Sequence, residues 1–536
     1  MNYLQVNLDP DRGWLNANGS TVRGSAFAGD ELKQGAALAK HFEDAVYPQE
    51  FVSLLEGVNG FYAVVLQKGS SVMAAVDRVR SIPLFYAFTK NKLFLSDNAE
   101  WVRQQIGDQQ RDSLAETEFL LTGYVTGEDT LYPNVKQLRA GELLAARVNA
   151  DRVTVEKIRY YRYTHTVESE VDKDALEASL DHVVINCVHR LIRWADGRSI
   201  VIPLSGGYDS RLIATMLRRL GYDHIMAFSY GRPGNKEAEY SKWIAKSLDI
   251  PWYFIPYSNE AWLRWFHSQE REAYYRFAHN LTSLPHIQDW PAVQALKNQG
   301  LIEPNAVFVP GHSGDFLAGS HIPKRFFAKI SIGKESFLEE VLRKHYSLWP
   351  FDNIDAAMKV NLQERIVRLA EVDDLMAPER AVDAFERWDW QERQAKFIVN
   401  SVRVYEFWGH NWWLPLWDAE MMEFWAGVPL ELRKEQQLYI DYVTRIYSRM
   451  TGLASDVAAQ SSNNTPVSTL RQAVKQTHMF PLAKAIYRII KQGQEYYGDP
   501  LAIYGIVPRV TFDALYSQAE SINSYLVKDI LGHISL

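Results

Sequence analysis

The pattern of hydrophobic and polar positions divides the chain into two parts of different character. Before residue 162 the hydrophobic residues form short runs separated by Gly, Asn or Lys, and these predict β-strands at residues 6–8, 61–66, 71–76, 84–88 and 92–95. Residues 42–55 and 113–122 have hydrophobic positions at helical spacing. We therefore expect an α+β domain built on antiparallel strands.

From residue 175 onward, predicted strands alternate with predicted helices. The strands are expected at residues 199–204, 224–230 and 252–257, and the helices at residues 176–194 and 236–248. This alternation predicts a doubly wound parallel sheet, which binds ligands at the carboxyl ends of its strands. Further helices are expected at 337–344, 355–369 and 381–405. The polar segment 162–174 is the expected linker between domains 1–161 and 175–536.

The strand at 199–204 leads into a turn of unusual composition. It ends in Ser205-Gly206-Gly207, followed by Asp209 and Ser210, before helical spacing resumes at residue 212. Two glycines let the backbone approach a ligand, and free N–H groups at the start of a helix attract anions. The two hydroxyls add hydrogen bonds, and Asp209 can hold a metal ion against phosphate oxygens. A Gly-Gly pair alone would equally suit a plain polar cap.

The complete string Ser-Gly-Gly-x-Asp-Ser resembles the pyrophosphate loop (PP-loop) of the ATP pyrophosphatase group. That group splits ATP into AMP and pyrophosphate while a carboxylate is activated as its adenylate. Residues 54–102 resemble the second half of the class II glutaminase domain of asparagine synthetases, with Gly60-Phe61, Asp77-Arg78 and Pro83-Leu84-Phe85-Tyr86 in the matching order. The resemblance to this family covers nearly the whole chain. It implies an Ntn-like antiparallel sandwich followed by an adenine nucleotide α-hydrolase-like parallel sheet.

The resemblance also implies a nucleotide and metal site. The segment 227–231 would line the adenine, although by itself it reads as a strand end before a turn. In residues 307–321, aligning the glycines puts Asp315 on the family's metal-binding aspartate, although a lone Asp is usually a solvated loop residue. The family implies ATP and Mg²⁺ as cofactors. The implied nucleotide-binding residues are Leu204, Ser205, Gly206, Gly207, Asp209, Ser210, Phe228, Ser229, Tyr230 and Gly311, and the implied metal ligands are Asp209 and Asp315.

Two residues are catalytic candidates on the same basis. His312 stands where the family has a Glu near the reaction centre, and it suits either a base acting near neutral pH or an ordinary loop histidine. Lys434 is the only lysine near the position of the family lysine that stabilises charge during acyl transfer. Seven tryptophans between residues 388 and 425 suit packing, and one or two could line an acceptor pocket.

The glutaminase chemistry of the family does not carry over. Glutaminases of this type use a cysteine at the processed N-terminus. Residue 2 is Asn2, and the only cysteine, Cys187, lies among hydrophobic residues and is expected in the core. The first domain is therefore expected to be structural. Nitrogen would come from free ammonia, an amine substrate or a separate ammonia-donating partner.

Composition and charge narrow the partners and the cellular location expected for this protein. A net charge of −7 over 536 residues gives no electrostatic case for nucleic acid as a partner. We expect a cytoplasmic protein, because neither a signal segment nor a membrane-spanning run is visible. The basic amphipathic stretch 470–491 is expected to be a solvated helix face. The sequence is also compatible with a homodimer.

The expected activity is that of an ATP-dependent amide ligase acting on a small-molecule or peptide carboxylate. Its substrate would be a non-aspartate acid, such as a uronic acid of a surface polysaccharide, or aspartate itself. Two alternatives stay open: intramolecular amide closure, as in β-lactam synthetases and lasso-peptide cyclases, and a nucleotide-binding scaffold without catalysis.

Overall fold

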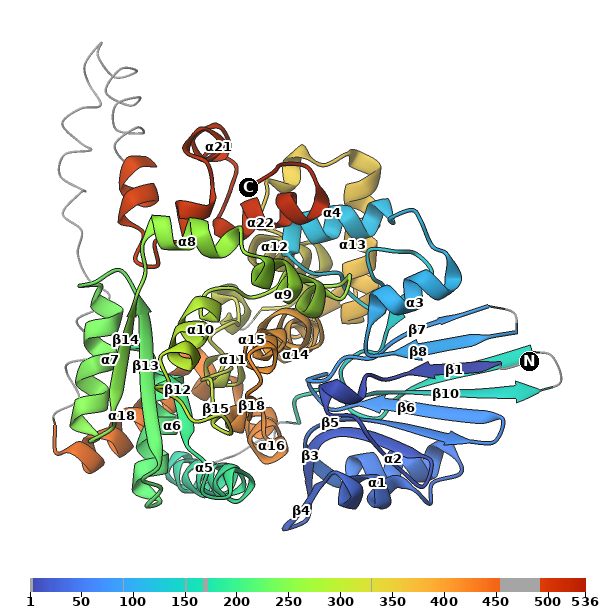
Figure 1. Cartoon of the computed structure of the whole chain (residues 1–536), viewed down its shortest axis with the longest axis horizontal. Helices are drawn as coiled ribbons and strands as arrows, with labels where there is room; N and C mark the ends of the chain where they lie inside the picture. The colour runs from blue at the N-terminus through green and yellow to red at the C-terminus, as the bar shows by residue number, and fades with distance from the viewer. Residues whose placement is uncertain (1–2, 90, 150–151, 167–171, 329, 454–491) are drawn as a thin grey trace.

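The computed structural model describes residues 3–89, 91–149, 152–166, 172–328, 330–453 and 492–536. Figure 1 shows a first domain of blue and cyan strands beside a second domain that runs from green to red. The fold is mixed α/β, with antiparallel sheets in the first domain and a parallel sheet in the second. The predicted fold class is confirmed. The predicted segment 470–491 lies outside the described residues.

The first domain is a sandwich of two sheets whose facing side chains form one hydrophobic core. All strand pairs are antiparallel except the pair of β1 with β8. One sheet has seven strands: β2 (Leu15–Ala17), β3 (Ser20–Ala28), β4 (Glu31–Gln34), β5 (Val58–Lys68), β6 (Ser71–Val76), β10 (Glu142–Asn149) and β11 (Arg152–Arg159). The other has four: β1 (Leu4–Asn7), β7 (Phe85–Phe88), β8 (Leu93–Ser96) and β9 (Lys136–Gln137).

The helices of the first domain cover the sandwich and correct one expectation. Residues 42–55 do not form a single helix. They are divided between α1 (Ala36–Phe42) and α2 (Pro48–Glu56), because Pro48 takes the first position of a new helix after the turn at 43–47. Both helices pack on the seven-stranded sheet. The predicted helix at 113–122 is α4 (Ser113–Thr122), which follows α3 (Ala99–Ile106).

The second domain is built on a five-stranded parallel sheet with the order β14-β13-β12-β15-β18. The predicted alternation of strands and helices is confirmed in α5 (Lys173–Ala195), β12 (Ile200–Pro203), α6 (Tyr208–Arg219), β13 (Ile225–Gly231), α7 (Lys236–Ser247) and β14 (Trp252–Pro256). Strands β15 (Val307–Phe308) and β18 (Asn411–Trp412) complete the sheet. In Figure 1, α7 stands outside the edge formed by β14 and β13.

Helices make up most of what surrounds this sheet. The α-helices are α8 (Asn259–Phe266), α9 (Gln269–His279), α10 (Trp290–Asn298), α11 (Gly314–Leu317), α12 (Lys334–His345), α13 (Ala356–Ala370), α14 (Pro378–Asp389), α15 (Arg403–Phe407), α16 (Ala419–Gly427), α17 (Leu430–Arg433), α18 (Gln437–Thr451), α21 (Arg509–Leu515) and α22 (Ile522–Leu531). The described short 3₁₀ helices are η1 (Pro10–Arg12) in the first domain and, in the second, η2 (Lys324–Phe327), η3 (Phe351–Asn353), η5 (Val399–Val402), η6 (Pro415–Trp417), η7 (Lys434–Gln436) and η10 (Ile503–Ile506). A small two-stranded antiparallel sheet pairs β16 (Ile332–Gly333) with β17 (Leu375–Met376).

The segment predicted as one helix at 381–405 is helical throughout but changes its winding. After α14 it continues as the π-helix η4 (Trp390–Ile398), then as the 3₁₀ helix η5 (Val399–Val402), and then as α15. Hydrophobic spacing alone does not distinguish these windings, because all of them bring a residue back to the same face after three to five positions.

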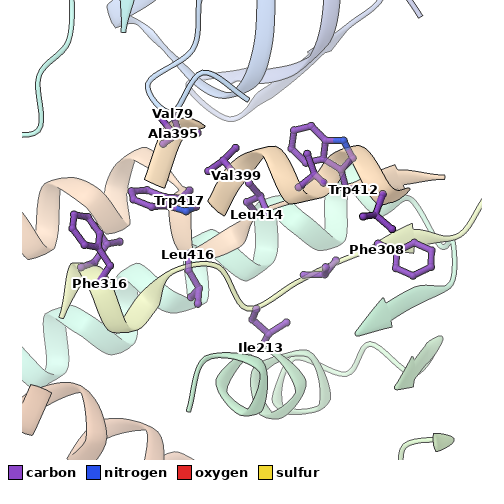
Figure 2. Packing of buried hydrophobic residues seen from close by; sticks show 14 of the residues in the cluster. Val79, Ile213, Phe308, Phe316, Ala395, Val399, Trp412, Leu414, Leu416 and Trp417 are labelled. Atoms are coloured by element: carbon purple, nitrogen blue, oxygen red, sulfur yellow. The ribbon is translucent and has the colours of Figure 1, made fainter. Parts of the chain in front are cut away.

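The two domains share a hydrophobic core and several buried polar contacts. Figure 2 shows Leu414 and Leu416 between Val399 on one side and Ile213 on the other, with Val79 of the first domain close to Ala395. Arg403 donates to the Ser81 carbonyl at 2.6 Å, and Trp390 donates to the Arg78 carbonyl at 3.0 Å. These contacts attach the helices of the second domain to the sandwich.

Two further expectations concern buried residues. In the expected linker, the side chain of Tyr163 is buried, and the His165 ring lies 2.7 Å from Glu386. This part of the segment therefore packs into the second domain. Cys187 is buried in α5, as expected. Among the described residues, no helix combines the length and apolar character needed to cross a membrane.

Candidate active site

The Ser-Gly-Gly turn connects β12 to α6, and the helix begins earlier than the hydrophobic pattern suggests. Asp209 and Ser210 belong to the first turn of α6 rather than to the loop before it. The Ser210 hydroxyl oxygen accepts the Ser205 N–H at 3.2 Å, and the Ser205 hydroxyl accepts the Gly207 N–H at 3.1 Å. No side chain caps the start of α6. This helix end is therefore open to an anion.

A second glycine-rich turn, after β15, packs directly on the first. A Cβ atom at Gly311 would lie 2.8 Å from the Ser210 nitrogen, and one at Gly314 would lie 2.5 Å from the Tyr439 hydroxyl. Both distances are too short for any side chain. Gly311 is required because the two turns approach each other so closely, and Gly314 because its turn also packs against the Tyr439 side chain of α18.

The meeting of the turns brings Asp209 and Asp315 together. The Asp315 N–H donates to Asp209 Oδ2 at 3.2 Å, and the Tyr439 hydroxyl donates to Oδ1 at 2.7 Å. Burial and the charge of Asp315 raise the pKa of Asp209 to about 7. Two carboxylates in this arrangement favour a bound cation.

The two turns line a cavity of about 470 Å³. Eight of the residues predicted from the sequence line it: Ser205, Gly207, Asp209, Ser210, Tyr230, Gly311, His312 and Asp315. Its other lining residues are Pro203, Tyr208, His286, Gln288, Asp289, Pro310, Tyr405 and Gln436. Among the described residues, this lining includes three aspartates and no lysine or arginine.

Five predicted residues do not line this cavity. Leu204 and Phe228 are buried in the core, where the Phe228 ring contacts Phe308 at 6.1 Å between centroids. The Ser229 hydroxyl donates to the Leu204 carbonyl at 2.7 Å and so joins the ends of β12 and β13. The Gly206 carbonyl accepts a hydrogen bond from Arg211 at 2.7 Å. The fifth, Lys434, is exposed and lies two positions before Gln436.

Sequence reasoning missed the part of the cavity wall made by His286, Asp289 and Tyr405. The Tyr405 hydroxyl donates to Asp289 Oδ2 at 2.8 Å, and the His286 ring lies 3.3 Å from Asp289 Oδ1. Burial raises the pKa of Asp289, but these two partners outweigh it and hold the pKa below its usual value. The residues come from the segment before α10 and from α15, more than a hundred positions apart. No local motif marked them.

Comparison with known proteins agrees with this architecture. A family model described as asparagine synthase matches residues 179–440, and one described as a glutamine amidotransferase domain matches residues 45–161. The chain has the architecture of the asparagine synthetase family. The predicted resemblance is thus confirmed, and an ATP-dependent amide-forming ligase is the activity that this architecture supports. No curated protein sequence matches the chain.

Similar solved structures share only parts of the chain. An NH3-dependent NAD synthetase from Campylobacter jejuni aligns at 14% identity and a TM-score of 0.20, over 38% of this chain and 96% of its own. A glutamine phosphoribosylpyrophosphate amidotransferase from B. subtilis, complexed with ADP and GMP, aligns at 9% identity and a TM-score of 0.18, over 55% of this chain and 61% of its own. TM-scores this low do not bear on the fold.

His312, the first catalytic candidate from the sequence, lies in the cavity wall. Its Nδ1 is buried and has no hydrogen-bond partner among the described residues. Burial and the nearby His286 lower the pKa of His312 to about 4, so the ring is neutral at pH 7. Its catalytic role stays a prediction.

A second layer of polar residues supports the turn that carries Asp315. Gln394 of η4 accepts a hydrogen bond from Ser313 at 2.9 Å and donates to Asp389 at 3.2 Å. Asp389 also lies 2.6 Å from the Nδ1 atom of His321. The π-helix therefore holds the second glycine-rich turn in place.

Lys344 of α12 reaches the same region. Its Nζ donates to the His321 carbonyl at 3.3 Å. Burial lowers the pKa of Lys344 to about 8, although the negative charges of Asp389 and Asp315 oppose this change. In this family architecture Lys344 is a second candidate, beside Lys434, for the cation near the reaction centre.

The glycines of the two turns give a direct test of the nucleotide cradle. Gly207 lines the cavity, and a Cβ there would meet only the movable Ser205 hydroxyl, at 3.2 Å. We expect Gly207→Ala to change the free energy of unfolding by no more than about 1 kcal/mol and to remove most of the rise in unfolding temperature caused by ATP and Mg²⁺. The measurement is thermal unfolding with and without the nucleotide.

Two matched variants complete this test. Gly311→Ala should lower the unfolding temperature even without ATP, because its Cβ would collide with main-chain atoms of α6. Gly427→Ala should leave both quantities unchanged, because no atom lies within 4 Å of its Cβ position. A full ATP effect in Gly207→Ala would contradict the cradle.

Proposed function

We propose that the protein activates a substrate carboxylate as an acyl-adenylate, releases pyrophosphate, and transfers the acyl group to ammonia or an amine. The observation that carries this proposal is the meeting of two glycine-rich turns at one cavity, with Asp209 and Asp315 beside an uncapped helix start. This arrangement suits a polyphosphate accompanied by a divalent cation.

The metal would be held by Asp209 and Asp315, and Mg²⁺ fits this donor set because carboxylate oxygens are its usual protein ligands. No cluster of three or more His, Cys, Asp or Glu suited to a metal occurs among the described residues. The remaining positions would therefore be filled by phosphate oxygens and water. The bound ion would neutralise charge on the triphosphate.

The chain's own groups account for binding and orientation. N–H groups of the 205–207 turn and of the first turn of α6 would bind the phosphates. The substrate carboxylate attacks the α-phosphorus of ATP, the bond to the β-phosphate oxygen breaks, and pyrophosphate leaves. The amine nitrogen then attacks the acyl carbon, AMP leaves, and the nitrogen loses a proton. His312 lines this cavity and is our candidate acceptor for that proton.

The cavity favours a particular class of acid. Aspartate would bring a second carboxylate that needs a cationic partner, and none is found among the described lining residues. His286, Gln288 and Asp289 instead offer groups that bind hydroxyls or an ammonium. This supports a non-aspartate substrate rich in hydroxyls, such as a uronic acid of a surface polysaccharide. Aspartate itself is the second candidate.

The two alternative functions predict different results in an activity assay. In intramolecular closure, Asp289 would hold the amine of the same molecule, and ammonium would not be required. In a scaffold without catalysis, nucleotide would bind but not be split. The paired carboxylates favour turnover over a scaffold, because holding two like charges together is costly unless a cation joins them.

We also propose that the chain does not hydrolyse glutamine by itself. Residue 2 is Asn2, and the single cysteine is buried in α5 with a raised thiol pKa caused by burial. The matched amidotransferase segment begins only at residue 45. Nitrogen would therefore come from free ammonia, an amine or a partner.

The first test measures the products. With ATP, Mg²⁺, ammonium and a panel of carboxylic acids, we expect AMP and pyrophosphate to accumulate with a competent acid. Glutamine in place of ammonium should support only the rate that its ammonia contamination allows. Formation of ADP, or release of glutamate from glutamine, would contradict the proposal.

The control for this assay exchanges single carboxylates. Asp209→Asn should abolish pyrophosphate release without loss of the folded state, because the amide keeps the size of the side chain but not its charge. Asp223→Asn, on the exposed turn after α6, should retain full activity. Unchanged turnover in Asp209→Asn would remove the metal assignment.

His312 gives a second prediction. Replacing it with Asn should lower kcat about 100-fold at pH 7.5 and leave the KM for ATP nearly unchanged, because the N–H groups and carboxylates proposed to bind ATP and its metal stay in place. His224→Asn at an exposed position serves as the control. Since the pKa of His312 is about 4, wild-type kcat should show no inflection near pH 6.5 from this residue. Such an inflection, lost in His312→Asn, would contradict the buried neutral ring.

The two candidate lysines can be separated by their pH dependence. We expect Lys344→Met to slow pyrophosphate release by about tenfold or more, and Lys434→Met to have a smaller effect. The pKa of Lys344 is about 8, so its charge, and with it the rate, should fall as pH rises through 8. Lys344→Arg should keep the rate above pH 8. The opposite order of effects would assign the role to Lys434.

A further inference from the structure

A second cavity, which we call the arginine cavity, lies between the domains and shares no lining residue with the candidate active site. It measures about 370 Å³ and is bounded by the end of β11, the segment 127–129, and helices α13, α14 and η4. Seven of its thirteen lining residues are Lys or Arg, and three are Asp or Glu. The walls thus carry a formal excess of four positive charges, from seven minus three.

Ion pairs within the walls and just behind them account for most of this charge. Five of the basic residues have a carboxylate partner: Arg139 with Glu142, Lys157 with Glu128, Arg162 with Glu371, Arg365 with Asp129, and Arg387 with Asp383. Within the described residues, Arg159 and Arg368 have no carboxylate within ion-pair distance. Two positive charges on the cavity wall are therefore uncompensated.

The side chain of Arg159 is positioned to bind a ligand, because the protein itself leaves part of its guanidinium group without partners. Its guanidinium lies over the Trp390 ring at 5.6 Å and contacts the Gln391 side-chain oxygen at 3.4 Å, while Nε and Nη2 have no partner. Burial and the neighbouring charge of Arg139 lower the pKa of Arg159 to about 10. Keeping this arginine charged is costly until an anion compensates both effects.

Arg387 adds a second incomplete hydrogen-bond set on the α14 side. The residue is only 5% exposed, and its two terminal nitrogens bind Asp383 at 2.8 Å and the Ala370 carbonyl at 2.9 Å. Its Nε has no partner. Buried guanidinium N–H groups without partners are uncommon in folded proteins. Several other described arginines also have one, and Arg159 and Arg387 are the two that line this cavity.

We propose that the arginine cavity binds a small molecule carrying a diphosphate group. Guanidinium groups pair with phosphate oxygens through two parallel hydrogen bonds, and several arginines around one cavity suit a compact anion with more than one charge. The volume of about 370 Å³ has room for a diphosphate with an attached organic group. Inorganic pyrophosphate and an organic diphosphate share this chemistry. The proposal does not depend on the activity proposed above.

The test uses the full chain in metal-free buffer, so that binding through Asp209 and Asp315 is suppressed. Calorimetric titrations with inorganic pyrophosphate, UDP, ADP and citrate measure the affinity. We expect a double variant, Arg159→Gln with Arg368→Gln, to weaken diphosphate binding by about tenfold or more. Asp209→Asn should bind as the wild type does.

Matched controls separate this site from general electrostatics and from misfolding. Arg152→Gln with Arg449→Gln removes two exposed positive charges elsewhere and should leave the affinity unchanged. The double cavity variant should stay folded and unfold within a few degrees of the wild type without ligand, because it loses the contacts of Arg159 with Trp390 and Gln391 but no ion pair. Pyrophosphate should raise that temperature in the wild type but not in this variant.

The possible results of these titrations lead to different conclusions about the ligand. Equal binding of pyrophosphate and the nucleotides assigns the recognition to the diphosphate alone, and tighter nucleotide binding assigns it to an organic diphosphate. No binding of any diphosphate, or citrate binding as tightly as pyrophosphate, would overturn the proposal. It would also be overturned if Asp209→Asn lost the binding while the cavity variant kept it.

Discussion

Asp209 and Asp315 are brought together by a hydrogen bond from the main-chain N–H of Asp315 to the Asp209 carboxylate, in a cavity whose described walls carry no lysine or arginine. The other features of the site follow from this pair of like charges. It raises the pKa of Asp209, and it leaves the carboxylates without a cation of their own. A side chain at Gly311 would prevent the close approach of the two turns, and one at Gly314 would collide with Tyr439 of α18 and with Asp209. A polyphosphate arriving with a divalent ion would satisfy the carboxylates and the open helix start together.

The helix that runs from α14 into η4 connects the chemistry of the site to the rest of the molecule. One part of its surface carries Arg387 and Gln391 in the arginine cavity, and another carries Asp389 and Gln394 behind the second glycine-rich turn. Its Trp390 also donates to the first domain. Although the first domain lacks the cysteine of a glutaminase, it packs against this helix and so contributes to the support of the active-site turn.

The sequence was informative where function depends on consecutive residues. Buried strands such as β12 appear in the sequence as hydrophobic runs. The Ser-Gly-Gly turn that follows β12 has a composition that is typical of an anion-binding site. The wall containing Asp289 and Tyr405 could not be predicted, because it forms only when distant segments pack together. The break between α1 and α2 was not predicted. It occurs at Pro48, which starts α2, but the hydrophobic spacing of residues 42–55 continues across this proline and suggested a single helix. Lys344 was missed because its distance from Asp315 is set by tertiary packing.

The π-helical winding of η4 has a consequence for comparing this chain with its relatives. Each residue of a regular α-helix turns the chain by about 100°, so removing one residue between Asp389 and Gln394 would rotate every later side chain by about that angle. Gln394, which contacts Ser313, lies within this π-helical segment. A relative with one residue fewer here would have to support the turn from another helical position. An alignment drawn without a gap would then equate side chains that face different directions.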